Sequence, residues 1–313
     1  MNLVGSWLRW FDRFQRRHRL SAFALAVQKK YSDDRGGHLA ALITYYAFLS
    51  IFPLLLAFFT IASYLLAGHG LLLHTLDRHL GSYPVLGPAI AQLEGNHLQG
   101  SIAAVVVGVI GLVWGAMGLS QTLQHCMDEA WNVPGKDRAG FVPRLLRGLT
   151  WYLVFGVGFV ASALVSSLGS VLGWAAGPVL SSLPALVINV ALFAASFRVL
   201  SPPHLGLPQL WRGALFSGTL WTVLTSVGIG LSRHLSHSNA LYGSFAPVLG
   251  LIAFLYLAAR LSLYGVEADV VRARHLWPRS LLDSTAGTAD RQELIDLARR
   301  EERAKTQTVR VEF

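Results

Sequence analysis

Residues 148–197 read GLTWYLVFGVGFVASALVSSLGSVLGWAAGPVLSSLPALVINVALFAASF, and these fifty residues include no Asp, Glu, Lys, Arg or His. A helix on the surface of a soluble protein needs a polar face toward water, and this stretch supplies none. About 20 apolar residues cross the hydrocarbon layer of a membrane, so fifty residues predict two crossing helices. Gly177-Pro178 and residues 181–184 (SSLP) mark the expected turn between them. The stretch therefore predicts a membrane protein.

Other parts of the chain have the same character. Four more stretches contain no Asp, Glu, Lys or Arg: 36–76, 95–127, 213–232 and 234–259. We therefore predict an all-α, polytopic membrane helix bundle with six transmembrane helices, at about 39–67, 101–124, 147–172, 183–200, 211–231 and 244–268. The predicted domains are a basic N-terminal segment (1–38), the transmembrane domain (39–272) and a polar C-terminal tail (273–313).

The positive charge of the chain indicates its orientation. The net charge is +9, with 26 Lys and Arg residues. If the N-terminus lies inside, all of these except three fall on the inner side: Arg78 and Arg233 lie outside, and Arg260 lies within the membrane. The positive-inside rule then places both termini in the cytoplasm. Because orientation accounts for the charge, we expect membrane lipids as partners and no nucleic acid.

The two tails differ in composition. In the N-terminal segment apolar residues recur at helical spacing, away from the arginines: Leu3, Trp7, Trp10, Phe11 and Phe14. This pattern is typical of a helix on the inner leaflet, or of one packed on the bundle's own inner face. In the C-terminal tail, Asp290 with Glu293 resembles a capping box, which predicts a solvated helix through about Arg303.

Small residues form stripes on three of the predicted helices. They are Gly108, Gly111, Gly115 and Gly118; Gly158, Ser162, Ser166 and Ser170; and Gly218, Thr222, Ser226 and Gly230. In lipid, helices associate through close backbone approach, so these stripes favour bundle packing over a transport groove.

The first predicted helix has a proline near its middle. Pro53 lacks a backbone N–H, which leaves the carbonyl of Leu49 without its helical partner. Ser50 lies one turn earlier and could bond to a freed carbonyl, while Tyr45 and Tyr46 lie two turns before the proline. A broken helix beside hydroxyl groups is typical of a binding site at the membrane midplane. The alternative is a plain kink that helps the bundle to pack.

The last predicted helix carries two charges, Arg260 and Glu267, seven residues apart on one face. Ionisable residues within membrane spans are costly and often functional, so the two could pair within a cavity. Alternatively, Arg260 reaches the cytoplasmic phosphates on its own while Glu267 meets water. Three amides complete the candidates: Asn189 as an interhelical hydrogen bonder, and Gln121 and Gln124 as residues lining a cavity.

Nothing in the chain predicts a catalytic or cofactor site. The single cysteine, Cys126, excludes an intrachain disulfide and a cysteine-based metal site. We also find no phosphate-binding loop, nucleophile elbow or HExxH motif. We predict no enzyme activity, no metal and no cofactor.

Two segments carry a family resemblance. Residues 41–56 read ALITYYAFLSIFPLLL, while the last helix opens with Tyr242-Gly243-Ser244 and closes with Tyr264-Gly265-Val266-Glu267-Ala268. Together they resemble the YihY/BrkB family of bacterial inner-membrane proteins, also called virulence factor BrkB. The usual closing motif is Gly-Ala-Glu, so Val266 is a departure. The resemblance covers about 36–272 and implies six membrane helices; it makes Tyr242 a further site candidate.

The same family carries the label ribonuclease BN, which these residues do not support. Metal-dependent RNA cleavage needs carboxylates or histidines that converge on a metal, and the inner loops offer few of them. We therefore expect a transporter-like protein that handles a lipid or another envelope amphiphile. The alternative is an envelope scaffold without transport, and the sequence leaves a homo-oligomer open.

Overall fold

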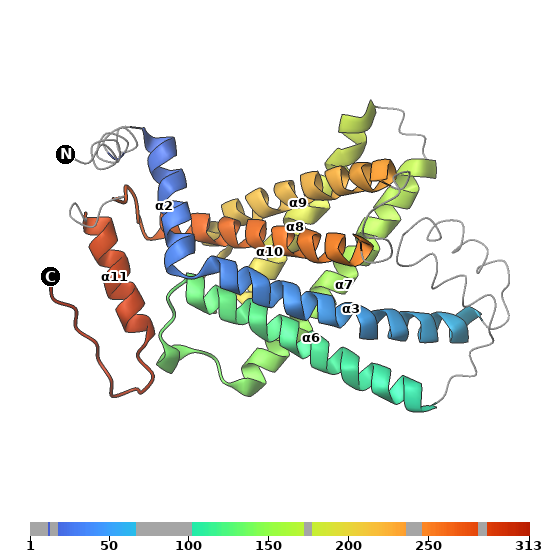
Figure 1. Ribbon diagram of the computed structural model, residues 1–313, viewed down its shortest axis with the longest axis horizontal. Coiled ribbons are helices and arrows are strands. Elements are labelled where there is room, and N and C mark those ends of the chain that lie inside the picture. Colours follow the sequence, from blue (N-terminus) through green and yellow to red (C-terminus); the bar gives the residue numbers. More distant parts are fainter. Residues whose placement is uncertain (1–11, 13–17, 67–101, 172–176, 236–245, 281–286) are drawn as a thin grey trace.

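The computed structural model describes residues 12, 18–66, 102–171, 177–235, 246–280 and 287–313 (Figure 1). Within these ranges the regular structure consists of α-helices and one short 3-10 helix, Gly135–Asp137. The predicted all-α class is thereby confirmed for the described part of the chain. The N-terminal apolar positions, from Leu3 to Phe14, lie outside it.

Six long helices form the bundle: α3 (Gly36–Leu66), α6 (Ile102–Ala130), α7 (Phe141–Val171), α8 (Gly177–Leu200), α9 (Leu207–Leu235) and α10 (Ala246–Ala273). Each one corresponds to one of the predicted segments. By length and composition, Leu183–Leu200 and Val248–Ala273 are candidate membrane spans in the described ranges. That all six helices cross the membrane stays a prediction.

The turn predicted within the charge-free stretch is not found at residues 181–184. Helix α8 already begins at Gly177, and Pro184 lies inside it, so the turn expected at 181–184 is wrong. Pro178 follows the first residue of α8. A proline in the first turn of a helix loses only an N–H that has no helical partner there.

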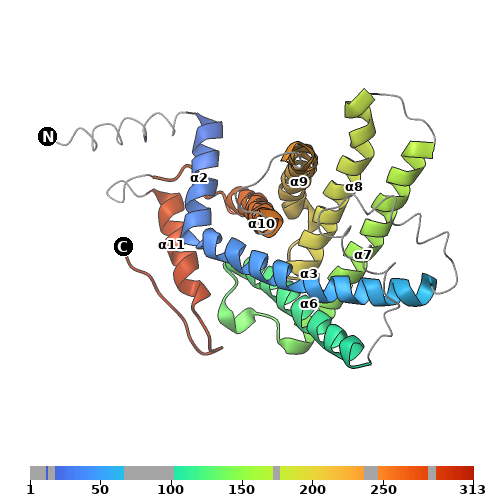
Figure 2. The ribbon, with the colours of Figure 1, turned by 45° about the vertical axis from the view of Figure 1, so that its right-hand side comes forward.

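Two shorter helices, α2 (Arg19–Asp33) and α11 (Thr288–Arg300), lie side by side across one end of the bundle (Figures 1 and 2). At this end α3, α7 and α9 begin, and α6, α8 and α10 end. We call it the network end, because the charge network described below lies there. The C-terminal residues lie at the same end (Figure 1).

A tight corner joins α2 to α3. Asp34 donates its N–H to the Lys30 carbonyl, and Arg35 has a left-handed φ of 54°. Gly36 follows, and a Cβ there would overlap the Tyr31 ring. The corner therefore turns the chain from across the bundle to along it, with the Tyr31 ring packed against the bend.

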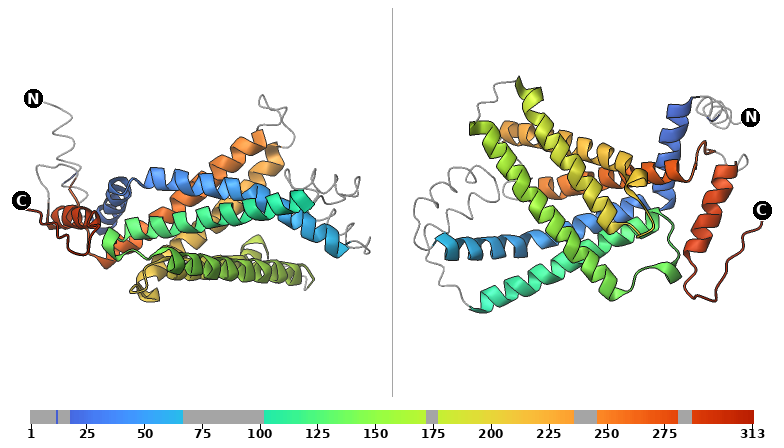
Figure 3. Two further views of the ribbon diagram at one scale, coloured as in Figure 1. Left: turned by 90° about the horizontal axis from the view of Figure 1, so that it is seen from below. Right: turned by 180° about the vertical axis from the view of Figure 1, so that it is seen from behind.

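The outer face of α7 is apolar. Seen from behind, α7 and α8 lie nearest the viewer (Figure 3). Exposed side chains recur every three or four residues along α7, with exposed fractions between 58% and 68%: Val142, Leu146, Leu149, Leu153 and Val157. An apolar stripe of this length suits lipid and would be a liability in water.

Inside the bundle, glycines let the helices approach closely. A Cβ on Gly118 would overlap the Tyr46 ring across the α3–α6 contact, and one on Gly218 would lie 2.7 Å from Val190 Cα across the α8–α9 contact. A Cβ on Gly158 would likewise overlap Leu192. Where they are described, the predicted small-residue stripes are thus packing lines.

Candidate functional site

The ammonium group of Lys30 lies at the centre of a buried charge network at the network end. It pairs with the carboxylate of Asp34, one helical turn later, and lies 3.2 Å from Glu293 Oε1 of α11 and 3.9 Å from Glu267 Oε2 of α10. The four side chains are at most 1% exposed. One cation from α2 is thus surrounded by three carboxylates from different elements.

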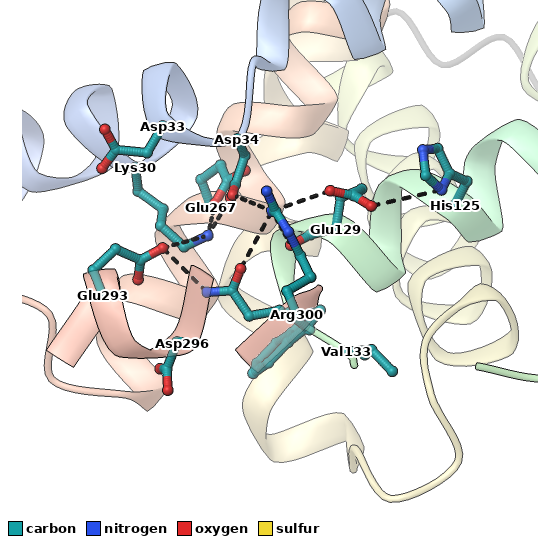
Figure 4. A network of polar contacts seen from close by, with 12 residues as sticks. Lys30, Asp33, Asp34, His125, Glu129, Val133, Glu267, Glu293, Asp296 and Arg300 are labelled. Carbon is teal, nitrogen blue, oxygen red and sulfur yellow. Dashed lines mark hydrogen bonds and ion pairs between the residues drawn. The ribbon is translucent and has the colours of Figure 1, made fainter. Parts of the chain in front are cut away.

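Arg300 of α11 extends this network toward α6 (Figure 4). Its guanidinium donates to Asp34 Oδ1 at 2.8 Å and lies 3.1 Å from Glu129 Oε2. Asn132 accepts from Arg300 at 3.3 Å through its side-chain oxygen and donates to Glu293 Oε1 at 3.1 Å through its amide nitrogen. The network therefore closes a ring of contacts between α2, α11 and the end of α6.

A second set of ion pairs fixes the start of α11 to α2. The carboxylate of Asp290 accepts from Lys29 at 3.0 Å and from Arg279 at 3.1 Å. It also accepts the backbone N–H groups of Ser280 at 2.9 Å and Gly287 at 3.1 Å. Burial acts to raise the pKa of Asp290, but these donors outweigh it and hold the pKa below its ordinary value.

The charges of the central network do not balance locally. Burial lowers the pKa of Lys30, but Glu267, Asp34 and Glu293 oppose this and leave the pKa raised overall. Burial raises the pKa of Asp34 even though Lys30 acts against it. Among the described residues, Glu267 Oε2 and Glu293 Oε2 are buried without a hydrogen bond. Carboxylate oxygens are therefore in excess around a single ammonium group.

Such a network is an expensive way to join helices. Removing charges from water costs several kcal/mol per ion, and apolar residues of similar volume would often stabilise as well or better. The network links α2, α6, α10 and α11 at one end of the bundle, so any relative movement of these helices at that end must break buried ion pairs. This property makes it the candidate functional site.

Of the predicted site residues whose side chains the structure describes, Glu267 alone belongs to the central network. Arg260 lies on the same helix but is exposed, with its guanidinium carbon 5.9 Å from the Tyr31 ring centroid and 5.7 Å from that of Tyr264. In the described part of the chain, no carboxylate lies within ion-pair distance of Arg260. The alternative in which Arg260 pairs with Glu267 is therefore wrong.

Of the tyrosine and serine candidates on α3, Tyr46 and Ser50 pack against α6. Tyr46 is half-buried, with its ring 5.1 Å from that of Tyr45, which is 55% exposed. Ser50 donates to the carbonyl of Tyr46 at 2.7 Å, whereas the proline frees that of Leu49. A Cβ on Gly115 would lie 3.0 Å from Ser50 Oγ, so α6 fills this side of α3.

Helix α3 runs as one α-helix from Gly36 to Leu66, so the helix continues through Pro53. The side chain of Pro53 lies outside the described residues, as does the whole of Tyr242.

The three amide candidates have separate positions. Asn189 donates to Thr222 Oγ1 at 3.0 Å and thereby joins α8 to α9, the interhelical role predicted for it. Gln124 is 2% exposed and donates to the Arg144 carbonyl at 3.0 Å, so it joins α6 to α7 and the cavity-lining role is wrong for it. Gln121 is half-buried on α6.

The sequence interpretation missed the residues that the tails contribute. Glu293 is buried and faces Lys30, so the description of the tail helix as solvated is wrong. The helix also begins earlier than expected: Asp290 occupies its third position and caps Gly287. The available signals were the Lys30–Asp34 spacing, typical of a helical ion pair, and acids interspersed among arginines in the tail.

Comparisons with known proteins agree on one group of membrane proteins. A family model described as virulence factor BrkB matches residues 27–286. Inner membrane protein YhjD of Escherichia coli (strain K12) is 26% identical over 275 residues, which cover 78% of each chain. A UPF0761 membrane protein of Pseudomonas aeruginosa (strain LESB58) is 24% identical over 83% of this chain. This chain spans 65% of that relative, just under two thirds.

A further relative has a different kind of name. YfkH of Bacillus subtilis (strain 168), named as ribonuclease-like, is 21% identical over 80% of this chain and 94% of its own. In this chain the neighbouring acids at the end of α6 lie against arginines: Asp128 Oδ2 is 3.4 Å from Arg144, and Glu129 Oε1 is 2.7 Å from Arg138. No solved structure matches the chain.

Proposed function

Because this chain belongs to the virulence factor BrkB family of membrane proteins, we propose that it is a multi-pass protein of the bacterial inner membrane that handles a lipid or another envelope amphiphile in the manner of a transporter. We propose no chemical reaction for it. The observation that supports this function is the buried charge network of Lys30, Asp34, Glu267, Glu293 and Arg300.

The proposed topology has six crossings with both termini in the cytoplasm. The six long helices alternate in direction, and the flanking helices α2 and α11 both lie at the network end. Of the Lys and Arg residues that the structure describes, all except Arg233 and Arg260 belong to segments at that end. By the positive-inside rule this end faces the cytoplasm.

In this arrangement the network acts as an inner gate. A transporter exposes its site to one side at a time by rocking one group of helices against another. Ion pairs between α2, α10 and α11 hold the cytoplasmic ends together in the present conformation. Opening would separate Glu267 from Lys30, and water would then hydrate the carboxylates that are in excess. The free energy that burial of these charges costs in the closed state is thereby regained when water hydrates them in the open state.

Lipid transfer between leaflets tests this function. The purified protein is reconstituted into vesicles that contain a trace of phosphatidylglycerol with a fluorescent headgroup, and dithionite is added outside. Without transfer, only the outer half of the label is reduced. We expect the wild-type protein to bring most of the inner-leaflet label into contact with dithionite. We expect Glu267→Gln to change the rate at which this label is reduced. Reduction that stops at the outer half with the wild-type protein would contradict the proposal.

The second candidate function is a scaffold without transport. It is favoured by the direct contact of α3 and α6 at Tyr46 and Ser50, where a midplane site was expected. A scaffold would leave the labelled lipid on its own side of the membrane while still binding a partner through its cytoplasmic helices.

A further inference from the structure

Arg260 is a charged side chain on the exposed face of α10. It is exposed, and in the described part of the chain no carboxylate neutralises it. Its described contacts are with aromatic groups: the rings of Tyr31 and Tyr264, and the Tyr264 hydroxyl at 3.4 Å. A guanidinium on a membrane helix needs an anion or water, because an unpaired charge in hydrocarbon is costly.

The groups around Arg260 present hydrogen-bond donors. Tyr264 donates its hydroxyl to Gln28 Oε1 at 2.6 Å, which leaves the NH2 group of this exposed glutamine as a donor. The rings of Tyr31 and Tyr264 stack at 4.2 Å, which fixes α2 against α10 here. The exposed guanidinium and amide donors together suit a phosphate group.

The apolar residues on the same face of α10 fit the rest of a lipid. Leu257 and Leu249 precede Arg260 by three and eleven residues, which places them on its side of the helix. They are 42% and 53% exposed. From Leu249 to Arg260 the helix rises about 16 Å. One leaflet of a hydrocarbon core about 30 Å thick measures about 15 Å, so this stripe matches a single acyl layer.

We propose that Arg260 and Gln28 bind the phosphate of an anionic phospholipid of the inner leaflet, whose acyl chain lies along Leu257 and Leu249. An anionic headgroup is favoured because no described protein carboxylate neutralises Arg260. The role of this lipid site in the cell rests on the proposed lipid-handling function. The site defines the lipid class that this function would select.

Binding is tested without transport, by native mass spectrometry of the full-length protein in nonionic detergent titrated with phosphatidylglycerol. We expect the wild type to retain this lipid and Arg260→Gln to bind it about tenfold more weakly, because a hydrogen bond to a charged group is lost. Arg291→Gln is the matched control: it removes an exposed arginine that lies over Phe313, away from α10. This variant should bind as the wild type does.

Two further measurements complete the test. Gln28→Leu, at an exposed position, should weaken binding as well, which keeps the test valid if Arg260→Gln does not fold. Phosphatidylcholine and inorganic phosphate replace phosphatidylglycerol in parallel titrations, and both should bind more weakly. Equal binding by the wild type and both variants would overturn the site. Inorganic phosphate that binds as tightly as the lipid would overturn the assignment to a lipid. Neither result depends on whether the protein moves lipid between leaflets.

Discussion

Arg260 and Glu267 lie two turns apart on α10, yet their surroundings have opposite character. Glu267 is 1% exposed and faces the Lys30 ammonium, whereas Arg260 is exposed and lies over two aromatic rings. The position of a charged residue along the helix thus does not determine whether its side chain is buried. Its burial depends on whether α2 and α11 cover it, as they cover Glu267.

Because the two side chains share no ion pair, their contributions to stability should add. We expect Arg260→Met and Glu267→Gln to combine within about 0.5 kcal/mol in a double-mutant cycle of unfolding in detergent. The cycle of Lys30→Met with Glu267→Gln is the control, and it should show coupling above about 1 kcal/mol. Coupling of that size between Arg260 and Glu267 would contradict the geometry.

Lys30 should be among the most sensitive positions of the chain. Lys30→Met leaves Asp34, Glu267 and Glu293 without their shared cation. Loss of one partner from a buried ion pair costs about 3–5 kcal/mol. Lys29→Met is the matched control, since that side chain is 27% exposed and is one of four donors to Asp290. Thermal unfolding of both variants checks this, and equal losses would be the contrary result.

At the scale of elements, the contact between α9 and α10 depends on glycine. A Cβ on Gly265 would overlap Ser217 Oγ and lie 2.8 Å from the Gly213 carbonyl oxygen. The family motif at 265–267 therefore combines a close helix contact, a core residue (Val266) and a network carboxylate (Glu267).

Two alanine substitutions on α10 separate packing from helix propensity. Gly265→Ala should destabilise the protein by about 1–3 kcal/mol, because the added methyl group forces the two helices apart. Gly250→Ala should instead be neutral or stabilise by up to about 1 kcal/mol, since no atom lies within 4 Å of its Cβ position and alanine favours a helix. Unfolding midpoints measure both effects. A Gly265→Ala protein as stable as the wild type would show that the contact is loose.

The docking of α11 should depend on pH through Asp290. Its folded pKa is held below the unfolded value of about 3.9, so its stabilisation is present above that pH and is lost as the pH falls through the folded pKa. We expect Asp290→Asn to cost about 1–3 kcal/mol at pH 6 and progressively less below about pH 4. Unfolding of both proteins from pH 6 to pH 3 measures the difference. A difference that stays constant would exclude this carboxylate as the cause.

At the scale of the whole molecule, the six long helices alternate in direction, so each of them has one of its two termini at the network end. Helices α2 and α11 cover that end, and the ion pairs of Lys30 and Asp290 join both to each other. In the proposed topology, α2 and α11 therefore share one side of the membrane whichever way the bundle is inserted.

The charge distribution predicts which side this is. A reporter that is active only in the periplasm should give no signal when fused to Phe313, because the described Lys and Arg residues concentrate at the network end. The same reporter inserted after Gly95, between the predicted helices 39–67 and 101–124, should be active. Strong periplasmic activity from the Phe313 fusion would overturn the orientation.

The sequence by itself determined the all-helical class, the approximate positions of the six long helices and the family. These follow from local properties: apolar runs without charges, short polar connections and two motifs read along single helices. The interhelical role of Asn189 was also predictable, because a lone amide among apolar residues needs a partner. Each of these inferences uses residues close together in the chain.

Only the tertiary structure decided the site. Lys30 lies more than two hundred residues from Glu267 and Glu293, and the segments that hold these residues were interpreted as separate domains. Their meeting depends on the corner at Arg35, which turns α2 across the bundle, and on the docking of α11 through Asp290. A charged residue in a polar tail looks solvated in sequence, because burial of a charge is favoured only where opposite charges from other elements converge on it.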